Sequence, residues 1–219
     1  MKNFRNHIFD LDGTIADSMG HWAKTMLSIV DDAGVDYPED IIKRITPLGD
    51  VGISKYFIEL GVPGSAEEII DRMHDVAIPK YRDIIPAKEG VCEYIKALKS
   101  RGCRLFVLTA SPHILVDPCL MRLGIFELFD GIFTTDDFGL SKSNPQIYHD
   151  LCTKARIDIN ETAFYDDNII ALKTGKEAGL FTVAVYDKAS DEYISEIKVL
   201  AGEYIESFSE LASDGLKEK

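Results

Sequence analysis

Short apolar runs rich in β-branched and aromatic residues alternate along most of this chain with amphipathic helical segments. A chain that returns to a strand after each helix makes crossover connections, which give a parallel sheet with helices on both faces. Glycines stand where two of these helices should end, at Gly102 and Gly179. The pattern therefore predicts a doubly wound, Rossmann-like α/β fold with a parallel sheet. The six expected strands are Phe4–Asp10, Arg104–Thr109, Gly131–Thr134, Thr162–Asp166, Thr182–Tyr186 and Glu203–Ile205.

One segment interrupts this alternation. Residues 18–84 contain amphipathic helical patterns punctuated by glycine and proline, but no convincing strand. We expect them to form a small α-helical domain inserted after the first strand. Residues 1–17 and 85–219 would then form the α/β core, with a polar C-terminal tail, residues 213–219, that frays.

Composition excludes several classes of protein. The 219 residues carry a formal net charge of −13, which opposes the basic surface that nonspecific nucleic-acid binding requires. No apolar run approaches the roughly 20 residues needed to cross a bilayer. The N-terminus "MKNFRNHIFD" reads as a strand and lacks the apolar region of a signal peptide. We therefore expect a cytoplasmic protein that binds neither nucleic acid nor membrane.

The four cysteines show no CxxC spacing, so the sequence predicts reduced thiols and no zinc site.

The stretch "DLDGT" places Asp10 and Asp12 two residues apart at the end of the first expected strand. In a continuing strand the two carboxylates would share a face and repel each other. Such a pair makes sense beside a cation, or where one member is protonated. The alternative is a solvated turn, since Asp and Gly favour turns.

Polar side chains also follow three other expected strands. In open α/β sheets, ligands bind beyond the carboxyl ends of the strands, so these side chains should meet at one edge. Independent turns would have no reason to place such groups together, which argues against the solvated turn. The further residues are Thr109 in "LTASP", Lys142 in "GLSKSNPQIY", and Asp166 and Asp167 in "FYDDN".

This set of groups suits phosphoryl transfer. Three or four carboxylates favour a hard cation, and Mg²⁺ typically shares carboxylates with a substrate phosphate. One carboxylate could attack phosphorus and a second could exchange a proton with the leaving oxygen. A hydroxyl and a lysine could hold the remaining phosphoryl oxygens. The residues alone do not say which aspartate attacks.

The segments "DLDGT", "LTAS", "SKSNP" and "FYDDN", in this order, resemble the four motifs of the haloacid dehalogenase-like hydrolase superfamily. The resemblance extends from Ile8 to about Leu211. The helical insertion between the first two motifs resembles the cap of the phosphoglycolate phosphatase and β-phosphoglucomutase branch. The third motif departs from the family's Lys-Pro-x-Pro pattern, because Ser143 replaces the first proline.

The resemblance implies catalytic roles for the matching residues. Asp10 would be the nucleophile and Asp12 the general acid and base. Thr109, together with the backbone at Ala110, would bind the transferring phosphoryl group. Lys142 would contact both that group and the nucleophile.

The resemblance also implies a Mg²⁺ cofactor. Asp167 and Asp166 would bind the ion together with the Asp10 carboxylate and the Asp12 carbonyl oxygen. Which member of the Asp166–Asp167 pair is the direct ligand is left open.

The function expected from these motifs is a Mg²⁺-dependent phosphatase that acts on a small phosphorylated metabolite, such as a sugar phosphate or a phosphoglycolate-like acid. A phosphomutase is one alternative, and a non-catalytic binding module on the same fold is another. The mutase depends on a histidine whose position falls on Trp22, with His21 one residue early, and one residue rotates a helical side chain by about 100°. The sequence does not choose between a monomer and a dimer.

Two cations in the insertion, Lys43 and Arg44, could contact a distal anionic group of the substrate. The alternative is a charge pair at a helix end that binds no ligand.

Overall fold

The computed structural model describes residues 3–46 and 48–214. It divides into two compact units, Met1–Asp17 with Pro86–Lys219 and Ser18–Ile85. This division falls one residue later than the boundary expected between residues 84 and 85. Residues 215–219 of the expected polar tail lie outside the described residues.

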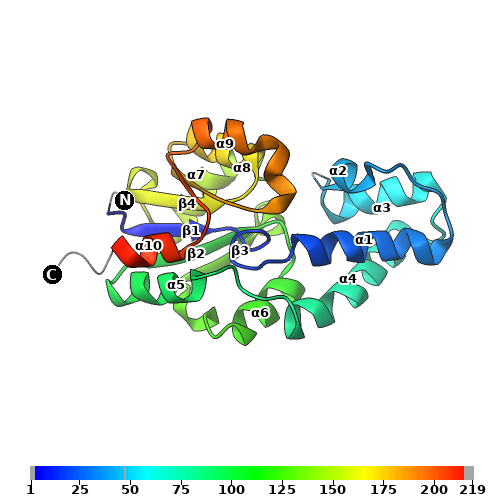
Figure 1. The fold of residues 1–219 in the computed structure, drawn as a ribbon, viewed down its shortest axis with the longest axis horizontal. Coiled ribbons are helices and arrows are strands. Elements are labelled where there is room, and N and C mark those ends of the chain that lie inside the picture. The colour runs from blue at the N-terminus through cyan, green and yellow to red at the C-terminus, as the bar shows by residue number, and fades with distance from the viewer. Residues whose placement is uncertain (1–2, 47, 215–219) are drawn as a thin grey trace. The chain divides into compact units, whose positions relative to one another are not determined.

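The α/β unit contains a six-stranded sheet in the order β3-β2-β1-β4-β5-β6, in which every pairing is parallel (Figure 1). The predicted doubly wound fold is confirmed. Because β1 lies between β2 and β4, the chain reverses its direction of winding there, and such switch points bind ligands beyond the strand ends. The strands are β1 (Asn6–Phe9), β2 (Arg104–Thr109), β3 (Gly131–Thr134), β4 (Thr162–Asp166), β5 (Phe181–Val185) and β6 (Glu203–Ile205).

Two strands differ from their predicted bounds. The first is shorter than Phe4–Asp10, because β1 pairs with β2 and β4 only over Asn6–Phe9 before the chain turns. The fifth, predicted as Thr182–Tyr186, both begins and ends one residue early, at Phe181 and Val185, because its pairing runs from Phe181 beside Ala163 of β4 to Val185 beside Ile205 of β6.

Alternate residues of β1 supply the two faces of the sheet. Ile8 packs with α7 and α8 in one apolar cluster, whereas Phe9 stacks on Tyr165 and lies near Tyr94 of α5 on the other face. Figure 1 shows α5, α6 and α10 on one side of the sheet and α7, α8 and α9 on the other. These helices are α5 (Val91–Ser100), α6 (His113–Arg122), α7 (Gln146–Ala155), α8 (Ile169–Glu177), α9 (Ile194–Leu200) and α10 (Ser209–Asp214), with short 3-10 turns η1 (Phe126–Leu128), η2 (Thr135–Asp137), η3 (Ile159–Glu161) and η4 (Lys188–Tyr193).

The second unit is helical, and its described residues form no strand. An apolar cluster that includes Met26, Phe57 and Met73 forms its core. A capping box between Ser65 and Glu68 fixes the start of the longest helix. That this unit acts as a cap over a site stays a prediction. Its helices are α1 (Met19–Ala33), α2 (Ile41–Ile45), α3 (Gly49–Leu60) and α4 (Ala66–Asp83).

The two chain segments that lead to the helical unit are joined by backbone hydrogen bonds within the α/β unit. The Asp17 N–H donates to the Pro86 carbonyl and the Lys88 N–H donates to the Ile15 carbonyl, both at 2.9 Å. The Lys88 ammonium also pairs with Asp187 at 3.0 Å and lies 3.8 Å from Asp17. These bonds fix the linkers beside the end of β1.

Among the described residues, none of the helices combines the length and apolarity that a membrane crossing requires.

Candidate active site

The loop after β1 turns sharply, so that Asp10 and Asp12 do not lie on one continuing strand. The Leu11 carbonyl accepts hydrogen bonds from the N–H groups of Ile15 and Ala16, at 2.9 and 2.7 Å. Gly13 adopts a φ of 79°, a left-handed conformation that favours glycine. The turn leaves Asp10 buried and Asp12 half-buried.

Lys142 lies between two of the carboxylates. Its Nζ donates a hydrogen bond to Asp10 Oδ1 and another, at 2.9 Å, to Asp166 Oδ2. The buried Tyr148 hydroxyl contacts the Lys142 carbonyl at 3.0 Å and the Ala171 carbonyl at 3.1 Å. Since both acceptors are backbone oxygens, Tyr148 anchors the lysine loop to α8.

The end of β4 places the two remaining carboxylates. Asp166 Oδ1 accepts from the Asn168 N–H at 2.8 Å, and the Asn168 side chain caps the first turn of α8. The Asp167 carbonyl accepts from the Ser190 hydroxyl at 2.9 Å. Both oxygens of Asp166 thus have protein partners at 2.9 Å or less, whereas, within the described residues, the Asp167 carboxylate accepts only a 3.5 Å contact from the Ser190 hydroxyl at Oδ2 and faces the glycine of the β1 loop.

The loop after β2 supplies hydroxyl groups. Thr109 is fully buried and its Oγ1 accepts from the Ser111 N–H at 3.1 Å. The Ser111 hydroxyl donates to Asp12 Oδ2 at 2.5 Å. Ala110, between them, is exposed. Ser111 therefore connects this loop to the one after β1.

Burial and crowding shift the ionisation of these groups. The pKa of Asp10 is raised to about 8, because burial, together with the nearby Asp166 and Asp12 carboxylates, outweighs the lowering by Lys142. Burial also raises the pKa of Asp167, and Asp166 and Asp10 add to this increase. For Lys142, burial opposes the charged form, but the Asp10 and Asp166 carboxylates outweigh it and raise its pKa. The site is thus crowded with negative charge that one ammonium group partly neutralises.

Asp10, Asp166 and Asp167 could hold a divalent cation. Each offers a carboxylate oxygen, and these three oxygens lie within 4.8 Å of one another. Oxygens bound to one Mg²⁺ at about 2.1 Å are at most about 4.2 Å apart, so a small adjustment brings all three onto one ion. An anionic set made only of oxygen donors suits a hard cation. The residues therefore fit a metal such as magnesium.

The family model for haloacid dehalogenase-like hydrolase matches residues 5–179. The chain belongs to the haloacid dehalogenase-like hydrolases. Among its relatives, hexitol phosphatase B of Escherichia coli O157:H7 is 25% identical in an alignment of 216 residues that covers 95% of this chain and 95% of that one. Phosphoglycolate phosphatase of Agrobacterium fabrum is 29% identical in an alignment of 189 residues that covers 81% of this chain and 78% of that one.

A solved structure of β-phosphoglucomutase from Clostridium difficile has the same fold. It superposes with a TM-score of 0.78 at 17% identity, covering 98% of this chain and 96% of the other. The superfamily and the phosphoglycolate phosphatase and β-phosphoglucomutase branch, both predicted from the motifs, are confirmed. This chain is thus a hydrolase whose relatives include phosphatases.

The structure of this haloacid dehalogenase-like hydrolase brings most of the predicted site residues together. Lys142 contacts Asp10 and Asp166 directly, and Asp167 completes the carboxylate group. Among the described residues, no hydrogen bond joins Thr109 to them directly, but Ser111 connects Thr109 to Asp12.

Sequence reasoning missed Ser111, Tyr148 and Ser190, which hold the site residues in place. Ser111 lies inside the second motif, two residues after Thr109, and this position in the motif was the one feature of the sequence that could have indicated a role at the site. Nothing in the local pattern singled out Tyr148 or Ser190. Each contacts a backbone carbonyl 23 positions away in the chain, Tyr148 that of Ala171 and Ser190 that of Asp167, and only the folded structure brings these groups together.

Two candidates in the helical unit make contacts within that unit. The Arg44 side chain donates to Asp40 Oδ1 at 2.8 Å, in an ion pair near a helix end. That Lys43 and Arg44 contact a distal anionic group of the substrate stays a prediction. Trp22 packs against the apolar cluster of this unit. The position where the mutase alternative requires a histidine is therefore occupied by a tryptophan that packs in the apolar cluster.

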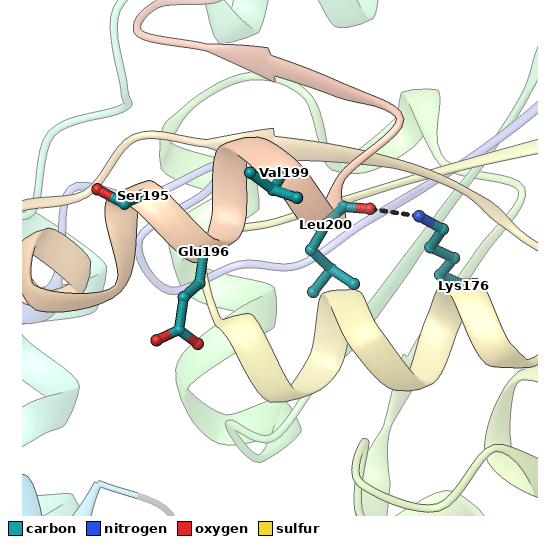
Figure 2. Close-up of a pocket in the computed structure, with 5 residues that line it drawn as sticks. All are labelled: Lys176, Ser195, Glu196, Val199 and Leu200. Carbon is teal, nitrogen blue, oxygen red and sulfur yellow. Dashed lines mark hydrogen bonds between the residues drawn. The ribbon is translucent and has the colours of Figure 1, made fainter.

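A shallow pocket lies between α8 and α9 (Figure 2). None of the predicted site residues lines it. Lys176 donates a hydrogen bond across it to the Leu200 carbonyl at 2.7 Å, and Val199 is 85% exposed. The other lining residues are Ser195 and Glu196. These groups do not form a catalytic arrangement.

Proposed function

We propose that this hydrolase is a Mg²⁺-dependent phosphatase that acts on a small phosphorylated metabolite. One observation carries the proposal: three buried carboxylates share a site with one buried lysine. Without a cation and an anionic substrate to bind, such a charge cluster would cost stability. A non-catalytic binding module would gain nothing from that cost.

In the first half of the reaction, an Asp10 carboxylate oxygen attacks the substrate phosphorus. The bond between phosphorus and the ester oxygen breaks, and Asp12 gives its proton to that leaving oxygen. In the second half, Asp12 removes a proton from water, and the water oxygen attacks the phosphorus of the aspartyl phosphate. Inorganic phosphate leaves, and both aspartates return to their starting states.

Three groups would hold the transferring phosphoryl oxygens. The Thr109 hydroxyl and the Ala110 N–H can donate hydrogen bonds, and Lys142 can supply positive charge. In the structure Lys142 already contacts the proposed nucleophile, so its ammonium group lies where charge would build up during attack.

Asp10, Asp167 and the Asp12 carbonyl oxygen would hold Mg²⁺, with Asp166 beside them. A bound Mg²⁺ ion would neutralise negative charge on the phosphoryl oxygens and on the attacking carboxylate. We assign Asp167 as the direct ligand of the pair, because both oxygens of Asp166 already accept hydrogen bonds from Lys142 and Asn168.

The relatives support a small substrate. One is a hexitol phosphatase and another is a phosphoglycolate phosphatase. We therefore infer that the substrate is a phosphorylated sugar, a sugar alcohol phosphate or a short phosphorylated acid. The helical unit, acting as a cap, would select for size and exclude water.

Phosphate release from a panel of compounds tests this function. The panel contains hexose and hexitol phosphates, phosphoglycolate, nucleotides and p-nitrophenyl phosphate, each measured with Mg²⁺ and with EDTA. We expect metal-dependent release from one or a few small members. Conversion of β-glucose 1-phosphate to glucose 6-phosphate without phosphate release would instead identify a mutase. Binding without turnover of any member would favour the non-catalytic module.

A further inference from the structure

Ser111 connects two catalytic loops through two different groups. Its hydroxyl donates to Asp12 Oδ2 at 2.5 Å, and its backbone N–H donates to Thr109 Oγ1 at 3.1 Å. Asp12 follows β1 and Thr109 ends β2, so the contact with Asp12 spans 99 positions of the chain. All three residues belong to the α/β unit.

The hydroxyl contact restricts the Asp12 carboxyl group. At 2.5 Å, this contact lies at the short end of the range for O–H···O hydrogen bonds. Fixing Oδ2 hinders rotation of the carboxyl group, so the position of Oδ1 is set as well. Since Oδ2 accepts from Ser111, Oδ1 is the oxygen that would carry the transferable proton in the proposed reaction.

The backbone contact orients the Thr109 hydroxyl. A hydroxyl has one proton and two acceptor sites, and the Ser111 N–H uses one of those sites. Within the part of the chain that the structure describes, the Thr109 hydroxyl has no acceptor for its own proton. That proton is therefore available to a phosphoryl oxygen.

We propose that Ser111 is a positioning residue whose hydroxyl aims Asp12 at the leaving oxygen of the substrate. The inference rests on the proposed phosphatase function and adds a residue to its machinery. As the phosphorus–ester bond breaks and the Asp10–phosphorus bond forms, the Asp12 proton moves to the leaving oxygen, while Ser111 keeps its own proton. Ser111 acts through Asp12 and does not touch the reacting atoms.

Two aryl esters of nearly the same shape separate this role from a merely structural one. p-Nitrophenolate is a weak base that leaves without protonation, whereas phenolate is more basic and gains from an acid. The value of kcat/KM reports the first, phosphoryl-transferring half of the reaction. The ratio of kcat/KM for phenyl phosphate to that for p-nitrophenyl phosphate thus measures how well the acid is placed.

The experiment compares wild type, Ser111→Ala and Ser111→Thr with Mg²⁺. Alanine keeps the N–H bond to Thr109 and removes only the contact with Asp12. We expect kcat/KM to fall about 10- to 100-fold for phenyl phosphate and less than about 3-fold for p-nitrophenyl phosphate. Threonine keeps a hydroxyl and should restore the ratio. Ser100→Ala, at an exposed serine bonded to the Ala97 carbonyl, is the matched control and should change neither value.

Equal losses on both esters, or no loss on either, would overturn the positioning role. So would an altered ratio that Ser111→Thr fails to restore although the thermal unfolding of that variant matches wild type. A wild-type enzyme that is inactive on both esters and on the metabolite panel would refute the proposed function itself. The two failures are therefore distinguishable.

Discussion

The Asp167 carboxyl group occupies the space that a side chain at Gly13 would need. A Cβ atom placed on Gly13 would lie 2.6 Å from both Cγ and Oδ2 of Asp167, closer than real contacts allow. Gly13 also has a φ of 79°. Glycine in the first motif thus satisfies two requirements, one of backbone conformation and one of space for the carboxylate that we propose as a metal ligand.

Gly13→Ala should weaken both the fold and the metal site. A left-handed alanine costs about 1–3 kcal/mol in the free energy of unfolding, and Asp167 must also move. We expect a lower midpoint in urea and weaker stabilisation by Mg²⁺. Gly20→Ala is the control, since Gly20 lies within α1 with open space around it and should gain up to about 1 kcal/mol. Wild-type stability and Mg²⁺ affinity in Gly13→Ala would show that this contact is not needed.

Lys142→Met should make the protein more dependent on magnesium. Removing one partner of a buried ion pair leaves the Asp10 and Asp166 carboxylates without compensation, at a cost of about 3–5 kcal/mol. A divalent cation then relieves more repulsion than in wild type. We expect a larger rise in Tm between EDTA and Mg²⁺, together with a loss of turnover of at least about 100-fold. Lys176→Met, whose lysine bonds the Leu200 carbonyl outside the site, should behave like wild type. A smaller Mg²⁺ effect in Lys142→Met would contradict this account.

The two adjacent aspartates should differ in their effect on metal binding. Asp166→Asn alters a residue already held by Lys142 and Asn168, so we expect the Mg²⁺ Kd to rise about 10-fold, as for other residues that support ligands. Asp167→Asn removes the proposed direct ligand and should raise the Kd by more than about 100-fold. Calorimetric titration with Mg²⁺ measures both. The reverse order would transfer the ligand role to Asp166.

His7 should make folding sensitive to mild acid. Its Nε2 lies 3.2 Å from the Phe4 carbonyl, which only accepts, so this nitrogen carries the proton and Nδ1 accepts from the Tyr165 hydroxyl at 3.0 Å. Burial lowers the pKa of His7 to about 4, from the ordinary value of 6.5 that the residue has in the unfolded chain. Between these values the unfolded chain binds the proton first, so stability falls as the pH falls.

Between about pH 7.5 and pH 5, we expect the free energy of unfolding to fall by about 2 kcal/mol more in wild type than in His7→Gln. Urea unfolding at each pH measures the difference, and the variant serves as the reference for carboxylates that titrate in the same range. Equal pH dependence in the two proteins would mean that His7 accepts a proton without penalty in the folded state.

Much of the sheet could be predicted because each strand carries its own signal. The run from Arg104 to Thr109 is apolar and ends in a polar group, and its observed bounds match those predicted. The convergence of Asp10, Lys142 and Asp166 followed from one rule, that parallel strands present their carboxyl ends at the same edge.

The contacts that hold the site could not be read in the same way. The approach of Gly13 to Asp167 depends on a loop conformation, and the bond from Ser111 to Asp12 joins loops whose residues are 99 positions apart. Neither leaves a periodic pattern in the sequence. The Tyr165 hydroxyl beside His7 likewise depends on the register of β1 against β4.

The most direct test of the account is the turnover of Asp10→Asn beside wild type, with Mg²⁺, on the best substrate of the panel. The change is nearly isosteric, so far-ultraviolet circular dichroism and thermal unfolding should confirm an intact fold. We predict a loss of at least about 10⁴-fold in kcat, because the amide cannot attack phosphorus. Appreciable Mg²⁺-dependent turnover in an Asp10→Asn preparation free of wild-type enzyme would contradict the account.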